Sequence, residues 1–385
     1  KPKTAYEIGV RLVGSEMCIR DRLTKLTLGL IASLMVSTTA ALAGELSITG
    51  SAKATYSIRG SESASAQVGN PQGIGIANEF TLSASGELDN GMAWTYAQDI
   101  DGATVQDDAA MSLNTPFGLF KACVHECGLS ANLAFDNSVY GAGSDYGLTG
   151  TSAATTSAGD DATTFTWGTN ISSYNNVQFH TPADMLPFGL TVKVAFAPEA
   201  DGTMNSSNSA ATSTEAGNGV TQYRVDATPI DGLTLAASYL EIDDADAGST
   251  ATTQQAEHGG FAATYAVGPA TIGYGKFWVA PTLGAATAGT ARVIDYENSS
   301  WSIGVAANDN LSFSYNLESS DENNKTETVT NTTTRTTTEF EIRTIQAAYT
   351  MGGMTLTVAN KKLENMDYTD DKDGAETVFS VSMAF

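Results

Sequence analysis

The sequence predicts an all-β protein, a transmembrane antiparallel up-and-down β-barrel of about sixteen strands. Three observations predict it. Many short runs alternate between apolar residues and small or polar ones, which is the period of a strand with two different faces. Short turn motifs separate these runs, and long polar stretches lie between successive hairpins. After the first apolar run, no uninterrupted apolar stretch approaches the ~20 residues that a membrane helix needs, so a helical span is excluded.

The alternation is clearest in the last seven residues, FSVSMAF, where Phe379, Val381, Met383 and Phe385 are separated by small residues. A strand of this kind places its four large apolar side chains on one face. The same pattern recurs in residues 46–56, 301–306, 311–318 and 354–359. A soluble β-sandwich shows the same local alternation, with its apolar faces turned inward. The alternation alone therefore does not separate a sandwich from a membrane barrel.

Seven tight-turn motifs rich in Gly, Pro, Asn and Asp lie between the alternating runs. They fall at residues 89–91, 114–118, 186–189, 229–232, 267–269, 308–310 and 352–353. Long polar stretches lie at about 59–78, 101–107, 124–172, 198–219, 244–257, 281–295, 320–338 and 365–375. Seven hairpins, a first strand near 45–58 and a last strand near 376–385 give sixteen strands. An even number of strands places the start of the first strand and the end of the last strand on the same side of the barrel, that of the short turns.

The first 43 residues are set apart from the barrel. Residues 1–22, which contain KTAYEI and EMCIRDR, resemble a translated sequencing-library adaptor, and we treat them as an artefact of assembly. Residues 23–43 carry Lys25, an apolar run and the small-x-small motif Ala41-Leu42-Ala43, which is typical of a secretory signal peptide. The alternative is a short core helix. We therefore expect an exported chain whose barrel occupies residues 44–385.

The barrel segment is strongly acidic. Residues 1–43 hold six of the 19 Lys and Arg and three of the 43 Asp and Glu, which leaves 13 basic against 40 acidic residues, a net charge of −27. Nucleic acid and anionic lipid surfaces are therefore not expected as partners, because both bind basic proteins. Cations, in contrast, would be attracted by such a field.

Three features favour a membrane barrel over a sandwich. The chain carries an export signal, its strands are joined as a meander, and its terminal aromatic residue lies on the apolar face. In lipid every backbone polar group must be paired, so a sheet can cross the bilayer only if it closes on itself. We therefore expect the last strand, ending at Phe385, to pair with the first and to close the barrel, with the aromatic ring in the interfacial belt.

The segment from Gly44 to Phe385 resembles the Gram-negative general porins, especially those of alphaproteobacterial type. The resemblance rests on the opening ELSITGSAKATYSI, on TPFGLFKA ahead of the longest loop, and on the closing FSVSMAF. It implies a trimeric barrel in outer-membrane lipid that lets small hydrophilic solutes and ions diffuse passively. It also implies a third long loop, here about 124–172, that folds into the lumen. We further expect the C-terminal strand to be recognised by the barrel-assembly machinery.

The same resemblance implies that acidic residues of the third loop face a basic cluster on the pore wall. The candidate acids are Glu126, Asp136, Asp145, Asp160 and Asp161. The basic residues assigned to the lumen face are Lys53, Lys193, Arg224, Arg343 and Lys361. A charge facing lipid at mid-bilayer costs about 2–4 kcal/mol, which favours the lumen orientation. Because arginines are few, we predict a channel with a weak preference for cations.

Cys123 and Cys127 are the two cysteines outside the adaptor-like segment. An exported chain meets oxidising conditions, in which disulfides persist. In an extended strand, four residues at ~3.3 Å each separate the pair by more than the ~7 Å that a disulfide can bridge. A bond therefore requires a turn between them. The alternative, a metal site with His125, lacks a matching second pair of ligands. We favour a small disulfide-closed loop and leave its bonded state open.

Catalysis and cofactors find little support. The three histidines, His125, His180 and His258, belong to no G-x-S-x-G or H-E-x-x-H motif, so we expect no enzyme. Acidic loops provide the oxygen ligands that Ca²⁺ prefers, but no EF-hand run is present, so we expect no cofactor and leave Ca²⁺ binding by the loops as an open alternative. Two alternatives stay open: a secreted or surface β-rich structural protein or adhesin, for which segment 320–338 would be typical, and a substrate-specific channel.

Overall fold

The computed structural model describes residues 45–61, 72–101, 108–131, 170–198, 219–243, 252–327 and 333–385. Within these ranges the chain forms sixteen strands and three short 3₁₀ helices. The strands are β1 (Glu45–Ser61), β2 (Gln72–Glu87), β3 (Ala93–Asp101), β4 (Asp108–Thr115), β5 (Gly118–Val124), β6 (Asn176–His180), β7 (Thr191–Ala197), β8 (Gly219–Ala227), β9 (Leu233–Asp243), β10 (Glu257–Val267), β11 (Ala270–Ala280), β12 (Ala291–Ala306), β13 (Leu311–Glu327), β14 (Thr333–Met351), β15 (Met354–Glu364) and β16 (Gly374–Ala384). The 3₁₀ helices are η3 (Ile171–Ser173), η4 (Pro187–Gly189) and η5 (Met366–Tyr368). None of the described helices is both long and apolar enough to span a membrane.

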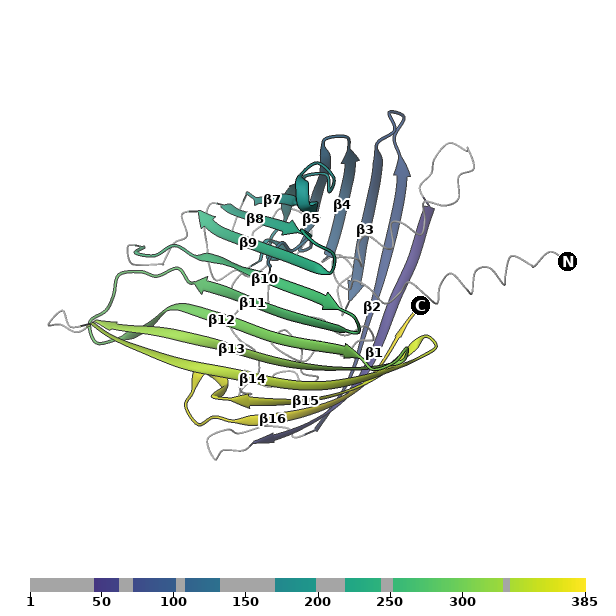
Figure 1. Ribbon diagram of the computed structural model, residues 1–385. Coiled ribbons are helices and arrows are strands. Elements are labelled where there is room, and N and C mark those ends of the chain that lie inside the picture. Colours follow the sequence, from purple (N-terminus) through teal and green to yellow (C-terminus); the bar gives the residue numbers. More distant parts are fainter. Residues whose placement is uncertain are drawn as a thin grey trace.

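The strands form a closed antiparallel barrel in which each strand pairs with its neighbours in the sequence, as predicted (Figure 1). The ring is closed by β1 and β16, which pair from Ser51 opposite Ala384 to Ser61 opposite Gly374. Gly50 and Phe385 then exchange two backbone hydrogen bonds, each 2.9 Å long. The Phe385 ring also meets Phe80 edge to face at 5.6 Å. The terminal aromatic residue is therefore part of the seam that closes the barrel.

The connections alternate between short turns at one end and longer segments at the other (Figure 1). Seven short connections fall at the positions of the predicted turn motifs, and β1 begins and β16 ends on the same side as these turns. Gly232 shows why glycine is needed there: its φ is 78°, and a Cβ atom would lie 2.5 Å from the carbonyl oxygen of Ala266. Among the longer connections, the one between β5 and β6 covers residues 125–175.

The two faces of the sheet differ in chemistry. The outward face carries large exposed apolar side chains on the strands around the ring. Examples are Leu46, Ile74, Met111, Phe196, Tyr223, Phe261, Trp301, Tyr315, Ile345, Val358 and Phe379. The inward face carries buried polar side chains, among them Gln178, Gln222, Asn298, Ser302, Asn316, Thr344, Gln346 and Ser380. The apolar belt is therefore on the outside, which is the reverse of a soluble sandwich and is the arrangement that lipid requires.

The outward face becomes polar toward the long-connection end. On β13 the outward residues Phe313, Tyr315 and Leu317 are followed by Ser319 and Asp321. At this level Lys276 of β11 forms an ion pair of 2.9 Å with Glu297 of β12, and its Nζ lies 5.1 Å from the centre of the Trp278 ring. The strands thus continue past the apolar belt into a polar zone.

Most of segment 320–338 belongs to these strands, whereas its composition predicted a loop. β13 runs to Glu327 and β14 begins at Thr333, and the two strands have 17 and 19 residues (Figure 1). Cross-strand hydrogen bonds between polar side chains support the pairing here. Asn323 donates to Asp295 at 2.6 Å, and Thr337 donates to Asn323 at 2.7 Å. The prediction was wrong because a polar composition was taken to exclude a strand.

The inward face is not polar throughout. A cluster of buried apolar side chains covers it on β11, β14 and β15 near η5. It contains Phe277, Val279, Phe340, Ile342, Leu363 and Met366. Tyr368 of η5 packs against this cluster and exchanges a hydrogen bond of 2.8 Å with Ser320. Toward the long-connection end, apolar residues therefore line part of the interior.

Substitution of Ile345 by lysine tests the assignment of the two faces. Ile345 points outward within the apolar belt and is 61 % exposed. We expect Ile345→Lys to lower the free energy of unfolding in lipid by about 2–4 kcal/mol, because the charge would face hydrocarbon. Thr350→Lys on the inner face of the same strand should change it by less than about 1 kcal/mol. Urea unfolding in vesicles, followed by tryptophan fluorescence, measures both, and equal losses would contradict the assignment.

Candidate functional site

The inner wall of β5 to β8 carries a group of charged side chains. Lys193 of β7 lies opposite His180 of β6 and Arg224 of β8, and Lys121 of β5 lies opposite Gln178 of β6. Strand pairing places directly opposite residues on the same face, so these side chains all point toward the interior. The described part of the chain thus brings two lysines, one arginine and one histidine together on four adjacent strands.

One carboxylate ties two of these basic groups together. Asp226 of β8 accepts an ion pair of 2.8 Å from Lys193 Nζ and another of 2.8 Å from Arg224. Arg224 Nε also donates to both carboxylate oxygens, at 2.9 and 3.1 Å. The guanidinium fork is suited to this two-oxygen contact. Lys193, Arg224 and Asp226 together carry one net positive charge, so the wall is less basic than its lysine and arginine content alone suggests.

Both described ends of the connection between β5 and β6 lie against this inner wall. The first end, residues 125–131, is hydrogen bonded by its backbone to Arg224, where Nη1 donates to the Ser130 carbonyl at 2.8 Å. The backbone amide of Ala131 donates to Ser238 Oγ at 2.7 Å. An apolar cluster joins both ends to the strands. It contains Leu129, Ile171, Tyr174, Ala195, Ala197, Val220, Leu240, Ile242 and Ala256.

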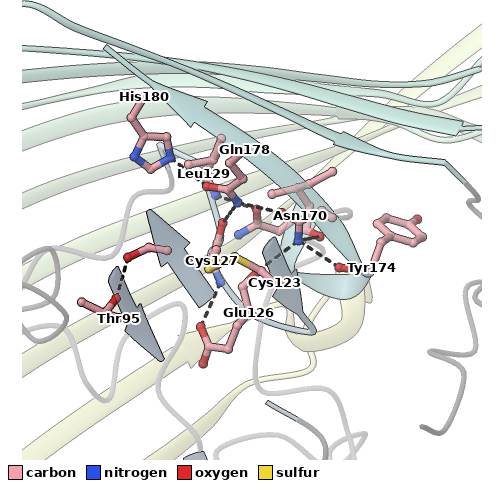
Figure 2. The surroundings of a disulfide bond; sticks show 12 residues. Thr95, Cys123, Glu126, Cys127, Leu129, Asn170, Tyr174, Gln178 and His180 are labelled. Carbon is pink, nitrogen blue, oxygen red and sulfur yellow. Dashed lines mark hydrogen bonds between the residues drawn. A yellow bond between two sulfur atoms is a disulfide. The ribbon is translucent and has the colours of Figure 1, made fainter. Parts of the chain in front are cut away.

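Amide side chains of the wall satisfy the backbone of these irregular segments. Gln178 Nε2 donates to the Cys127 carbonyl at 2.6 Å (Figure 2). Asn176 Nδ2 donates to the Glu126 carbonyl at 3.2 Å. Gln222 accepts from the backbone amide of Ile171 at 2.9 Å. Backbone groups away from water must find partners, and here side chains of β6 and β8 supply them. The two segments are therefore held in fixed positions on the wall.

Cys123 and Cys127 are joined by a disulfide, with their Cα atoms 6.1 Å apart (Figure 2). Cys123 points inward from β5, and both cysteines are buried beside Ala110. The chain turns between them, with left-handed φ angles of 51° at His125 and 68° at Cys127. The turn that the sequence required for such a bond is therefore present.

The other predicted basic residues of the lumen are spread around the ring. Lys53 points inward from β1, opposite Ser382. Lys361 points inward from β15 and forms an ion pair of 3.4 Å with Glu376 of β16, where the two side chains are 1 % and 3 % exposed. In the closed order of strands, β15 lies half the barrel away from Lys193 on β7. Lys53 and Lys361 are therefore separate from the cluster on β5 to β8.

Arg343 does not face the lumen. It lies opposite Leu317 on β13 and shares its face with the exposed Ile345, so it points outward just beyond the apolar belt. There it forms ion pairs with Glu341 and with Glu364, the latter at 3.2 Å. The prediction that Arg343 faces the lumen was wrong, because the neighbouring Ile342 belongs to the apolar cluster inside the barrel and the alternation of the strand then turns Arg343 outward.

Of the five predicted loop acids, the structure describes Glu126 alone. Glu126 lies at the turn after β5, where its carboxylate accepts the backbone amide of Cys127 at 2.9 Å. It interacts electrostatically with Lys121. The remaining four, Asp136, Asp145, Asp160 and Asp161, lie outside the described residues. Glu126 thus joins the inner-wall cluster, and the role of all five in a constriction stays a prediction.

The sequence reasoning missed several members of the cluster. Lys121 and Asp226 were not singled out, although each alternates with apolar neighbours as Lys193 does. The period-two rule that found Lys193 would have found both. Gln178 also lies between two apolar residues, Val177 and Phe179. No local pattern, however, indicated that Asn176, Gln178 and Gln222 bind loop backbone that lies distant in the sequence. Within the described ranges, no three His, Cys, Asp or Glu side chains are placed to hold a metal ion.

Comparison with solved structures finds the same fold in outer-membrane proteins and porins. An OmpT variant of Vibrio cholerae lacking loop L8 is 14 % identical, with a TM-score of 0.57 over 89 % of this chain and 100 % of that one. The anion-selective porin from Comamonas acidovorans is 12 % identical, with a TM-score of 0.55 over the same shares. The trimer form of Vibrio cholerae OmpT is 11 % identical, with a TM-score of 0.54, again over 89 % and 100 %. These similarities establish the fold.

No protein-family model matches the chain, and no curated protein matches it either. What the chain shares with these structures is the fold, a closed antiparallel barrel, here of sixteen strands.

Replacement of Arg224 by glutamine tests whether the inner-wall cluster faces the conducting path. We expect Arg224→Gln to raise the ratio of cation to anion permeability about fourfold, because one unit charge at ~10 Å in water changes the energies of a cation and of an anion by ~0.4 kcal/mol each, in opposite directions. Arg343→Gln removes the same charge from the outer face and should leave the ratio unchanged. Reversal potentials in a KCl gradient measure both variants, and an equal shift in the two would refute the assignment.

Proposed function

We propose that this protein is an outer-membrane porin, which forms a water-filled channel for passive diffusion of small hydrophilic solutes and ions. The observation that carries the proposal is the closed barrel with an apolar outward face and a polar inward face. A barrel of this kind is stable when lipid surrounds it and water fills its interior. The porin structures that share the fold support the same conclusion.

We propose that the channel prefers cations weakly. The net charge of −27 in residues 44–385 supports this, because it raises the local concentration of cations near the mouths of the pore. The wall cluster opposes it only slightly, since Asp226 takes up one of the charges of Lys193 and Arg224. Selectivity in such a pore follows from the charges along its narrowest part.

We further propose a homotrimer in the outer membrane of a Gram-negative bacterium, of the alphaproteobacterial type that the sequence resembles. The trimer form of Vibrio cholerae OmpT supports the assembly. The exposed aromatic residues at the C-terminal seam are consistent with recognition of β16 by the barrel-assembly machinery. The alternative of a soluble β-rich adhesin loses its main argument, because segment 320–338 lies largely in paired strands of the barrel.

Planar-bilayer recording tests the proposed function. The purified protein should need detergent, should migrate differently on gels before and after heating, and should insert into bilayers as stable conducting units. In a KCl gradient the reversal potential should have the sign of a small cation preference. Insertion events that come in groups of three equal steps would support the trimer. A protein that stays monodisperse without detergent, or that gives no conductance, would overturn the proposal.

A further inference from the structure

The disulfide forms a corner where β5 ends. Its ring contains five residues, from Cys123 to Cys127, and two of them have left-handed φ angles. An extended chain would carry residue 127 ~13 Å beyond residue 123. The disulfide instead holds their Cα atoms 6.1 Å apart and turns the chain onto the inner wall. The direction in which the segment starts is therefore fixed covalently.

After this corner, successive residues are held by inward side chains from three strands. Asn176 and Gln178 of β6 bind the carbonyls of Glu126 and Cys127. The Ser130 hydroxyl accepts from Gln222 of β8 at 3.0 Å, and Ser238 of β9 accepts the amide of Ala131. We call residues 125–131 the loop root. It crosses the inner face from β6 to β9 and follows the direction that the disulfide sets.

The loop root is connected to the charged cluster through Arg224. Its guanidinium group divides its donors between Asp226 and the Ser130 carbonyl. Asp226 in turn binds Lys193. A displacement of the loop root would remove the carbonyl partner of Arg224 Nη1 and leave the guanidinium held by Asp226 alone. The arrangement of charge on the wall therefore depends on where the loop root lies.

The disulfide contributes little to the barrel as a whole. In the chain-entropy account, the stabilisation by a disulfide increases with the length of the loop that the bond closes. This bond joins two residues that are only four positions apart, so its contribution is small. Barrel closure depends instead on the backbone pairing of sixteen strands. The effect of the bond is therefore local, at the loop root and the side chains that hold it.

We propose that the Cys123–Cys127 disulfide positions the loop root and, through Arg224, sets the ion selectivity of the channel, so that reduction of the bond changes selectivity without unfolding the barrel. This inference rests on the proposed channel function. The chemistry is a two-electron exchange: a small dithiol reduces the disulfide to two thiols and is itself oxidised to a cyclic disulfide.

The experiment compares the wild type with the double variant Cys123→Ser/Cys127→Ser in planar bilayers. We expect the variant to keep its heat-dependent gel shift and to show more open-channel noise. Its cation-to-anion permeability ratio should shift toward anions by up to about fourfold, the effect of one charge at ~10 Å in water on a cation and an anion together. The control variant is Thr350→Val/Thr355→Val. It removes a hydrogen-bonded pair on the inner wall of β14 and β15, away from the loop root, and should behave as wild type.

A second arm treats the assembled wild-type channel with a small dithiol, with mass spectrometry to confirm reduction. We expect the noise and reversal potential of the serine variant, and a return to the original values after reoxidation. This arm does not depend on folding of the variant. A serine variant whose gel shift, noise and reversal potential all match the wild type would overturn the inference while the channel function stands. A wild type that does not conduct would overturn both.

Discussion

The pairing of β1 with β16 is the constraint on which the rest of the structure depends. A sheet in hydrocarbon has no water to satisfy its backbone groups, and an open edge would leave a row of them unpaired. Once the ring is closed, every residue of a strand faces either lipid or the interior. The alternation that runs through the sequence follows from this division. The exposed Phe379 and the buried Ser380, neighbours in β16, are one instance of it.

Closure also encloses irregular backbone whose polar groups need hydrogen-bond partners, and side chains of the inner wall provide them. Irregular backbone can lie inside a barrel only where protein or water satisfies its polar groups. Here Asn176, Gln178 and Gln222 supply hydrogen bonds to the loop segments, and Arg224 serves two purposes, as a partner of Asp226 and of the Ser130 carbonyl. Arg224, which contributes to the charge of the wall, therefore also holds the chain that lies against it.

The sequence predicted the barrel well because its turns and its alternation are local features. The seven turn motifs and the final strand follow from glycine, proline and period-two patterns within a few residues. The errors arose where tertiary context decides. The apolar residue Ile342 faces inward because an apolar cluster lies inside the barrel at that level, and this reversed the assignment of Arg343. The disulfide corner depends on a turn at His125, where the sequence contains no glycine or proline turn motif.

The length of β13 and β14 has a consequence for how cells display this protein. With the long-connection end facing away from the cell, the far half of the hairpin would stand outside the bilayer, where Asn323 and Thr337 link neighbouring strands. What the surroundings would meet there is a rigid ladder of threonine and asparagine instead of a flexible peptide. Antibodies raised against short linear peptides from this stretch would therefore recognise the native surface poorly, whereas antibodies raised against the folded protein would bind it.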